Sequence, residues 1–433
     1  MAPVDCTAAR RAGTGAAVGS APAAGQVAAQ RAAAMNLTKN LIGAGMFTMP
    51  KALVHGSVLP GTCMLLFCGT VQGGTFVLIA FLCEKLKAKS YHEMMAKSIG
   101  PLAGTAVSAC IATNSFFACT SYLVLVADFL QKALEGLFGW QDASRPMLIL
   151  FSCIVPLVLS HARNLEPLKY TSLLGLLIIA LVFAYVGVTA ASNPGQVLEN
   201  WKGHAVGFNL GLFSTLALST GAFQAHYNAP RFYAEVGSRL DAHITTVKRS
   251  FGIAFLIYAT FALCGFGLYG KEVHGNVLKS FDPDDVCILL AWLGMAFAII
   301  FTFPLVLTTG RDSLISIVPA LRRLSKSSPT VSHVGITTTM VCTIASMACC
   351  VEDVSIVTRF LGSTVGASLC WIFPAWAYLK VSAPNKAGLN KALLSKSTDQ
   401  VVGPPWLKAC SYVMIVVGAL SMSVGLADTF GFL

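Results

Sequence analysis

The sequence predicts an all-α membrane protein that crosses the bilayer about eleven times. Hydrophobic residues make up 55% of the 433 residues and charged residues only 11%, with a mean hydropathy of +0.70, which is far more apolar than a water-soluble domain of this length. Apolar runs of about 20 residues, the length that crosses a ~30 Å hydrocarbon core, recur along almost the whole chain. Lys and Arg gather in alternate loops, as a stack of membrane-spanning helices requires.

Two of the runs are rich in small residues and differ from the others. The first, about 36–55, contains Gly43, Ala44 and Gly45 in its middle, and the sixth, about 206–228, is dense in Gly, Ser, Thr and Ala. Because irregular backbone survives in a membrane only where it lines a protein cavity, we predict that both are broken helices at a binding site. The remaining runs, in order, cover about 58–83, 105–130, 147–160, 168–190, 251–270, 286–310, 331–350, 355–379 and 406–427.

The basic loops orient the stack. If the N-terminus is cytosolic, the cytosolic side holds 22 of the 30 lysines and arginines, the opposite side holds six, and Lys39 and Arg359 fall in spans. Lys and Arg accumulate in short cytosolic loops, so this orientation is the expected one. The acidic stretches FDPDD and VED then lie on the outer side.

The same distribution limits the classes of function. The net charge of +11 is scattered over short loops, so the anionic inner leaflet is its natural counterpart and no nucleic-acid partner is expected. Most of the 14 cysteines lie inside spans as small apolar residues, and no spacing predicts a metal site. No nucleophile elbow, P-loop or metalloprotease motif occurs, so we expect neither an enzyme nor a cofactor. Residues 1–34 read as a flexible cytosolic tail, with an Arg-bearing, acid-poor transit peptide as the alternative.

Five stretches carry a family resemblance. The segment NLTKNLIGAGMFTMPKAL resembles the first helix of the amino acid/auxin permease family, in which a G-x-G break precedes a small apolar run and Pro. SYLVLVADF resembles the third helix, VPLVLSHARNLEPLKYTSLL the start of the fifth, and AFQAHYNAPRFYAE the sixth, where sodium-coupled neutral amino acid transporters carry a His nine residues before a Glu. DDVCILLAWLGMAFAIIFTFPLVLTTGR resembles the eighth, with T-x-P and an Arg seven residues later. The resemblance covers nearly everything from Asn36 to Leu433.

The resemblance implies a leucine-transporter-like fold. Helices 1–5 (about 36–190) and 6–10 (about 206–379) would form a five-plus-five inverted repeat with broken helices 1 and 6, followed by helix 11 (about 406–427), so that residues 35–433 make one transporter domain. A substrate carboxylate would meet N–H groups at the start of one half-helix, and its ammonium the carbonyls at the end of another. The expected substrate-binding residues are Gly43, Ala44, Gly45, Met46, Phe223 and His226.

Plainer interpretations of these residues stay open. The Gly-Ala-Gly run also suits a packing seam between helices, and Phe223 suits an ordinary core position. His226, an ionisable ring in a span, either lines the pocket and senses protons or stays neutral and hydrogen-bonded between helices.

Lys39, Asn40 and Thr302 bear on the coupling ion. Sodium-coupled relatives have an ion-binding Asn where this chain has Lys39, whereas proton-coupled relatives have Lys, so the resemblance favours H⁺. An ammonium would repel or replace sodium, and a buried amine is suited to proton exchange. Thr302 matches a threonine that completes the sodium site in those relatives, which keeps Na⁺ possible. Alternatively, Lys39 reaches the inner headgroups and Thr302 serves the backbone near Pro304.

We therefore expect a secondary active transporter of small neutral amino acids that works by alternating access. It would be a proton-coupled monomer in a plasma membrane or a vacuolar or lysosomal-type membrane. The alternatives are a sodium-coupled neutral amino acid transporter, a sensor that binds an amino acid without moving it, and a passive channel, which would need a continuous polar lining. The sequence does not specify the amino acid or the direction of net transport.

Overall fold

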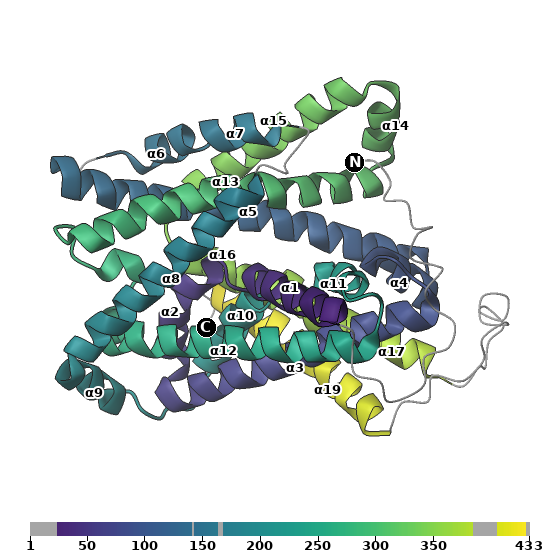
Figure 1. The fold of residues 1–433 in the computed structure, drawn as a ribbon, viewed down its shortest axis with the longest axis horizontal. Coiled ribbons are helices and arrows are strands. Elements are labelled where there is room, and N and C mark those ends of the chain that lie inside the picture. Colours follow the sequence, from purple (N-terminus) through teal and green to yellow (C-terminus); the bar gives the residue numbers. More distant parts are fainter. Residues whose placement is uncertain (1–23, 141–142, 163–167, 384–404, 430–433) are drawn as a thin grey trace.

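A computed structural model describes residues 24–140, 143–162, 168–383 and 405–429, and all regular structure in these ranges is helical (Figure 1). The prediction of an all-α membrane protein is confirmed. Eight helical stretches in the described residues are long and apolar enough to cross a membrane. Their principal helices are α3 (Val58–Leu86), α5 (Pro101–Phe138), α8 (Leu168–Ser192), α12 (Leu240–Tyr269), α13 (Val286–Ile317), α15 (Pro329–Cys349), the continuous run α16 (Val354–Leu361), η6 (Gly362–Ile372) and α17 (Phe373–Val381), and α19 (Pro405–Thr429).

Three further apolar segments are each divided, which accounts for the difference between eight long helices and eleven expected spans. The first consists of α1 (Ala24–Leu41), η2 (Ala44–Thr48) and α2 (Met49–Gly56). The sixth consists of α10 (Gly211–Ala222), η3 (His226–Asn228) and α11 (Ala229–Glu235). Both predicted interruptions are present. The fourth is also divided, into α6 (Arg145–Ser152) and α7 (Ile154–Ser160).

Short helices mark the two ends of the molecule. In Figure 1, α4 (Tyr91–Ser98), α11 and α14 (Pro319–Ser327) lie at one end, and α9 (Pro194–Gly203) lies at the other. At the first end, Ser90 Oγ caps α4 by accepting from the Glu93 N–H, and the Glu93 carboxylate accepts from the N–H of Lys89, the residue before the cap. Hydrogen bonds from Lys97 and from the Lys89 backbone lower the pKa of the Glu93 carboxyl.

At the opposite end, two acidic side chains start helices. Asp285 accepts from the N–H groups of Cys287 and Ile288 at the start of α13, and Asp353 accepts from the Ser355 N–H at the start of α16 (Val354–Leu361). The last Asp of FDPDD and the Asp of VED are thus the N-terminal caps of α13 and α16.

The connection between α12 and α13 is attached to α5 and α6 at this end of the molecule. It contains η4 (Gly270–Glu272) and η5 (Val277–Ser280), and Val277 and Leu278 are fully buried. Lys279 of η5 lies 3.3 Å from Asp128 on α5, and Arg145 on α6 lies 3.1 Å from the same carboxylate oxygen. Asp128 is only 2% exposed, so this ion triad holds three elements together from inside.

The N-terminal part of α1 packs along α12. Gln30 donates to the Ala242 carbonyl at 3.0 Å, Ser250 donates to the Ala34 carbonyl at 2.9 Å, and Arg239 donates to Gln26 at 2.9 Å. The helix therefore begins 11 residues before the expected domain boundary at 35, and the part of the expected tail before Ala24 lies outside the described residues.

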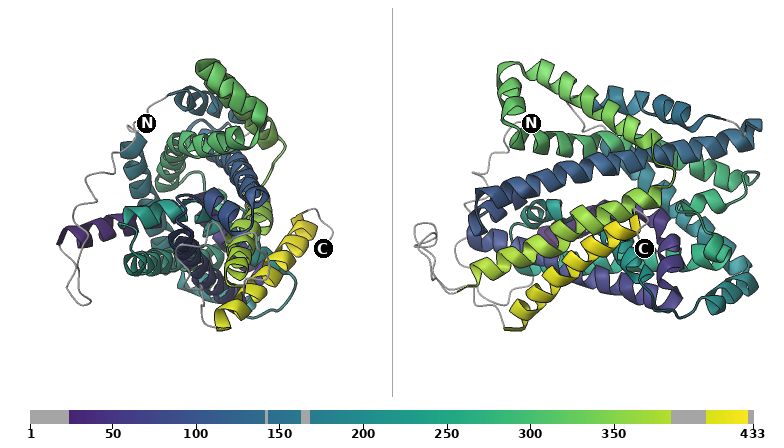
Figure 2. Two further views of the ribbon diagram at one scale, coloured as in Figure 1. Left: turned by 90° about the vertical axis from the view of Figure 1, so that its right-hand side faces the viewer. Right: turned by 180° about the vertical axis from the view of Figure 1, so that it is seen from behind.

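The tenth span changes helical type in its middle. Between α16 and α17 (Phe373–Val381), residues Gly362–Ile372 form the wider π-helix η6, which packs against α10 and α19. Figure 2 shows α19, in yellow, beside this span. A Cβ built on Gly362 would lie 1.7 Å from the Ala217 carbonyl oxygen of α10, so only glycine permits this approach. π-Helical turns are rare and are frequently found at functional sites.

Candidate functional site

The interruption of the first span lies at Ile42 and Gly43. The Ile42 N–H still donates to the Thr38 carbonyl at 2.9 Å, but Gly43 is extended, with φ −143° and ψ −156°. The chain then turns again as η2, where the Met46 N–H donates to the Gly43 carbonyl at 3.1 Å. The first N–H groups of a helix have no partner within it, so Ala44 and Gly45 present theirs at the break.

The second interruption faces the first. The α10 helix ends at Ala222, the next turn begins at His226, and Phe223, Gln224 and Ala225 connect them. A Cβ built on Gly45 would lie 3.0 Å from the Ala222 Cα, so the two breaks touch at this pair. The Asn228 side-chain amide also donates to Asn40 at 3.3 Å and links the two interrupted spans a second time.

Three tyrosines that sequence reasoning missed surround the paired breaks. Tyr258 of α12 donates to the carbonyls of Leu41 and Ala222, the last residues of α1 and α10. Tyr122 of α5 lies near Tyr258 and Tyr227, and Tyr227 interacts with the Asn40 and Asn228 side chains. The hydroxyl of Tyr258 within the apolar stretch 251–259 of α12 was the available signal.

The predicted substrate-binding residues lie on both breaks, in different surroundings. Gly43 is partly exposed and Met46 is fully buried, while Ala44 begins η2. Phe223 is also fully buried: its ring stacks on Phe251 at 6.0 Å, and its tip lies 3.0 Å from a Cβ built on Gly69 of α3. The role of Phe223 in substrate binding stays a prediction.

His226 joins three elements by hydrogen bonds. Its Nε2 lies 2.9 Å from Thr75 Oγ1 on α3, and its Nδ1 lies 3.0 Å from Cys370 Sγ on η6. Thr75 also donates to the Gln72 carbonyl at 3.1 Å, so its oxygen is left to accept from Nε2–H, and Nδ1 accepts the thiol proton. This assignment satisfies a neutral, fully buried imidazole. Proton sensing by His226 stays a prediction.

The predicted coupling-ion residues are divided between two parts of the molecule. Lys39 is half-buried in the last turn of α1, and no carboxylate of the described residues lies within ion-pair distance of it. Asn40 contacts Asn228. Thr302 lies on α13 and donates to the Ala298 carbonyl of its own helix at 2.8 Å. The α1 helix packs mainly on α12 and α11, whereas α13 packs mainly on α5 and α8.

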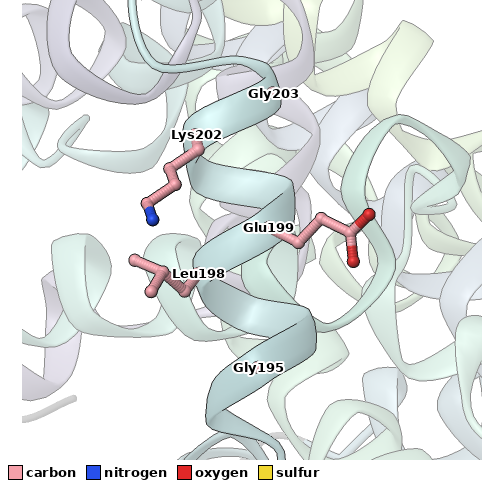
Figure 3. Close-up of a pocket in the computed structure, with 5 residues that line it drawn as sticks. All are labelled: Gly195, Leu198, Glu199, Lys202 and Gly203. Carbon is pink, nitrogen blue, oxygen red and sulfur yellow. The ribbon is translucent and has the colours of Figure 1, made fainter.

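A shallow hollow lies on the surface along α9, lined by Gly195, Leu198, Glu199, Lys202 and Gly203. Figure 3 shows Leu198 and Lys202 on one side of the helix and Glu199 on the other. All five residues belong to one exposed helix at an end of the molecule, so this hollow is separate from the paired breaks.

Comparison with known proteins agrees with this architecture. The family described as "Transmembrane amino acid transporter protein" matches residues 27–430. Vacuolar amino acid transporter 2 of Saccharomyces cerevisiae is 22% identical over 82% of this chain and 77% of its own length. Human solute carrier family 38 member 8 is 28% identical over 64% of this chain and 66% of its own length.

Solved structures support the fold. The crystal structure of MhsT in complex with L-phenylalanine has a TM-score of 0.52 at 14% identity and covers 92% of this chain and 98% of MhsT. This neighbour has the leucine-transporter-like fold, which confirms the predicted fold class, and the related proteins are transporters rather than enzymes. With two interrupted helices facing each other inside an apolar bundle and a family match over nearly its whole length, the chain belongs to the transmembrane amino acid transporter family.

Proposed function

We propose that this amino acid transporter is a secondary active carrier of small neutral amino acids, which works by alternating access and is driven by protons in preference to sodium. The supporting observation is the contact of the two breaks at Gly45 and Ala222, with Lys39 in the last turn before the first break. N–H groups at Ala44 and Gly45 suit a carboxylate, and the carbonyls in the last turns of α1 and α10 that do not accept from Tyr258 suit an ammonium group.

The side chains around the breaks favour neutral substrates. Tyr122, Tyr227, Tyr258, Asn40 and Asn228 offer hydroxyl and amide groups, which have no charge to pair with an acidic or basic substrate side chain. Small neutral amino acids such as alanine or glutamine are therefore the proposed substrates. The vacuolar yeast relative supports a vacuolar or lysosomal-type membrane as the site of action, with the plasma membrane as the alternative.

The half-buried Lys39 is the basis of the proton proposal. Its ammonium has no neighbouring carboxylate among the described residues, so burial favours release of its proton, and its positive charge disfavours a sodium ion nearby. Proton release and rebinding at Lys39, in step with movement of α1, would couple a pH gradient to substrate movement.

Uptake of labelled alanine and glutamine into proteoliposomes tests the proposal. We expect uptake to continue when choline replaces sodium and to rise when the outer solution is acidified. A gradient of one pH unit supplies about 1.4 kcal/mol, so coupling to one proton allows roughly tenfold accumulation. Binding measured by thermal stabilisation without any uptake would favour a sensor, and uptake that never exceeds equilibrium would favour a channel.

Variants of Lys39 separate its two possible contributions. Lys39→Arg keeps the positive charge but cannot release a proton near neutral pH, so proton-driven accumulation should fall by at least about tenfold. Lys39→Asn removes the charge and should create sodium sensitivity or reduce proton-driven uptake. Lys85→Asn, which changes an exposed lysine at the end of α3, is the control. Kinetics unchanged in both Lys39 variants would remove Lys39 from the coupling mechanism.

Sodium coupling is the second candidate, because Thr302 lies beside Pro304 in α13. Proline removes one hydrogen bond of its helix and leaves a carbonyl able to bind a cation. Strict sodium dependence of uptake in the wild-type protein would select this candidate and contradict proton coupling.

A further inference from the structure

Tyr258 lies between the ends of the two interrupted helices. Its hydroxyl donates to the Leu41 carbonyl, the last of α1, and lies 3.1 Å from the Ala222 carbonyl, the last of α10. The side chain is fully buried, and its ring meets Phe223 edge-on at 5.1 Å with an interplanar angle of 75°. The aromatic packing thus fixes the position of the hydroxyl in the middle of α12.

The two carbonyls would otherwise lack a partner. The last carbonyls of a helix accept no hydrogen bond from an N–H group of the same helix. The aligned peptide dipoles also give this end of the helix a partial negative charge. Two such ends that converge on one point form a site for a positive charge, and half-helix ends in membrane transporters hold cations in this way. A buried carbonyl left without a donor is costly, so the position requires either a hydrogen-bond donor or an ion.

A hydroxyl meets this requirement with one proton shared between two acceptors. The Tyr258 hydroxyl has a single hydrogen, which it donates to one carbonyl at a time. The other carbonyl oxygen then still lies beside the positive end of the O–H dipole. The Gly45–Ala222 contact brings the two helix ends close enough for one donor to serve both. No metal ion is needed to hold the breaks together while Tyr258 is in place.

We infer that Tyr258 is a positioning residue that takes the place of a monovalent cation between the carbonyl ends of α1 and α10. This inference rests on the proposed transport function, since it assigns to Tyr258 the alignment of the half-helix ends that bind substrate. It also separates two roles: Lys39 exchanges the coupling proton, and Tyr258 fills the neighbouring cation position permanently.

The variant Tyr258→Phe keeps the ring and removes the donor. Without sodium, we expect amino acid uptake to fall at least about tenfold, because the half-helix ends are no longer aligned. Added sodium should partly restore uptake and raise the melting temperature of the detergent-solubilised variant, since an ion can then occupy the vacated position. Tyr258→Ser, which is smaller and keeps a hydroxyl as a ligand, should show the same sodium-dependent stabilisation.

Tyr269→Phe is the matched control on the same helix, because the Tyr269 ring packs against Phe281 near the end of α12 and not at the breaks. It should behave as wild type in uptake and in its response to sodium. If neither Tyr258 variant gains stabilisation by sodium, or if Tyr258→Phe transports as wild type, the inference is overturned. A wild-type protein that moves no amino acid would instead contradict the proposed function, and the melting measurements would still test Tyr258.

Discussion

Gly43 and Gly45 are two residues apart in the same break and have different surroundings. A Cβ on Gly45 would press against the Ala222 backbone at 3.0 Å, whereas the nearest atom to a Cβ on Gly43 is the Leu41 carbonyl oxygen at 4.0 Å. Gly43 also has an extended φ of −143°, which any residue adopts. Gly45 is therefore needed for the close packing of the two breaks, whereas the space next to Gly43 could hold a side chain or a ligand.

This difference predicts that substitution by alanine affects stability at Gly45 and substrate binding at Gly43. Gly45→Ala should destabilise the protein by about 1–3 kcal/mol through overpacking, seen as a lower melting temperature. Gly43→Ala should leave the melting temperature nearly unchanged but weaken amino acid binding if the substrate lies against this backbone. Equal melting temperatures for the two variants would contradict the packing role of Gly45.

At the same scale, the sequence predicts where the backbone is irregular better than it predicts side-chain contacts. The Gly-Ala-Gly run foretells the first break because glycine disfavours helix. The partners of His226, Thr75 and Cys370, lie 151 and 144 residues away along the chain, so only the folded arrangement reveals them. Tyr258 escaped notice for the same reason, as its two acceptors come from helices that are distant in sequence.

Among the helices, proline has two different outcomes. The fourth span is divided at Cys153, three residues before Pro156, because the proline ring conflicts with the carbonyl four residues earlier, that of Ser152. Pro304 lies inside α13, which is nevertheless one continuous helix from Val286 to Ile317 and packs closely on α5. Both prolines are visible in the sequence, but a proline by itself does not tell whether its helix is divided.

The ion triad at Asp128 is the element-scale feature most open to test. Asp128→Asn should lower stability by about 3–5 kcal/mol, because Lys279 and Arg145 lose their shared buried partner. Adding Lys279→Met should recover part of the loss, measured as melting temperature in detergent.

The control for the triad lies on the same helix. Glu135→Gln disrupts the Lys132–Glu135 pair, whose side chains are 25% and 24% exposed, and such a pair contributes about 0–1 kcal/mol. A loss in Asp128→Asn no greater than in Glu135→Gln would show that the triad does not anchor the α12–α13 connection.

At the scale of the whole molecule, basic segments that the sequence places on one side of the membrane lie at one end, and which side that is stays a prediction. The basic α14, with Arg322, Arg323 and Lys326 exposed, lies at the same end as α4, and α9 lies at the opposite end (Figure 1). Hydropathy predicts a helical membrane protein because the bilayer is its solvent, whereas the leucine-transporter-like fold was implied by the family resemblance. The expected boundary at 35 missed the start of α1, although residues 24–34 are rich in alanine and also contain glutamine and arginine, which favour helix; the hydrogen bonds to α12 add to this propensity.

The orientation in the membrane is a prediction for the molecule as a whole. We expect an epitope inserted after Ser328, next to α14, to face the cytosol, and one inserted after Asn193, next to α9, to face the other side. Protease digestion of sealed vesicles, with and without detergent, checks both positions. Protection of the α14 epitope in vesicles with their cytosolic face outward would reverse the orientation, and equal exposure of both epitopes would contradict the topology.

The hydrogen bonds between the N-terminal part of α1 and α12 have a mechanical consequence. Three of them join these helices along residues 26–34, while the link from α1 to η2 consists of little more than Ile42 and Gly43. Because α12 runs past that joint and also packs on α2 and α3, a movement of α1 relative to η2 should strain the contacts of α12 on both sides of the break. Tyr258, which reaches from α12 to the ends of α1 and α10, lies where that strain would concentrate.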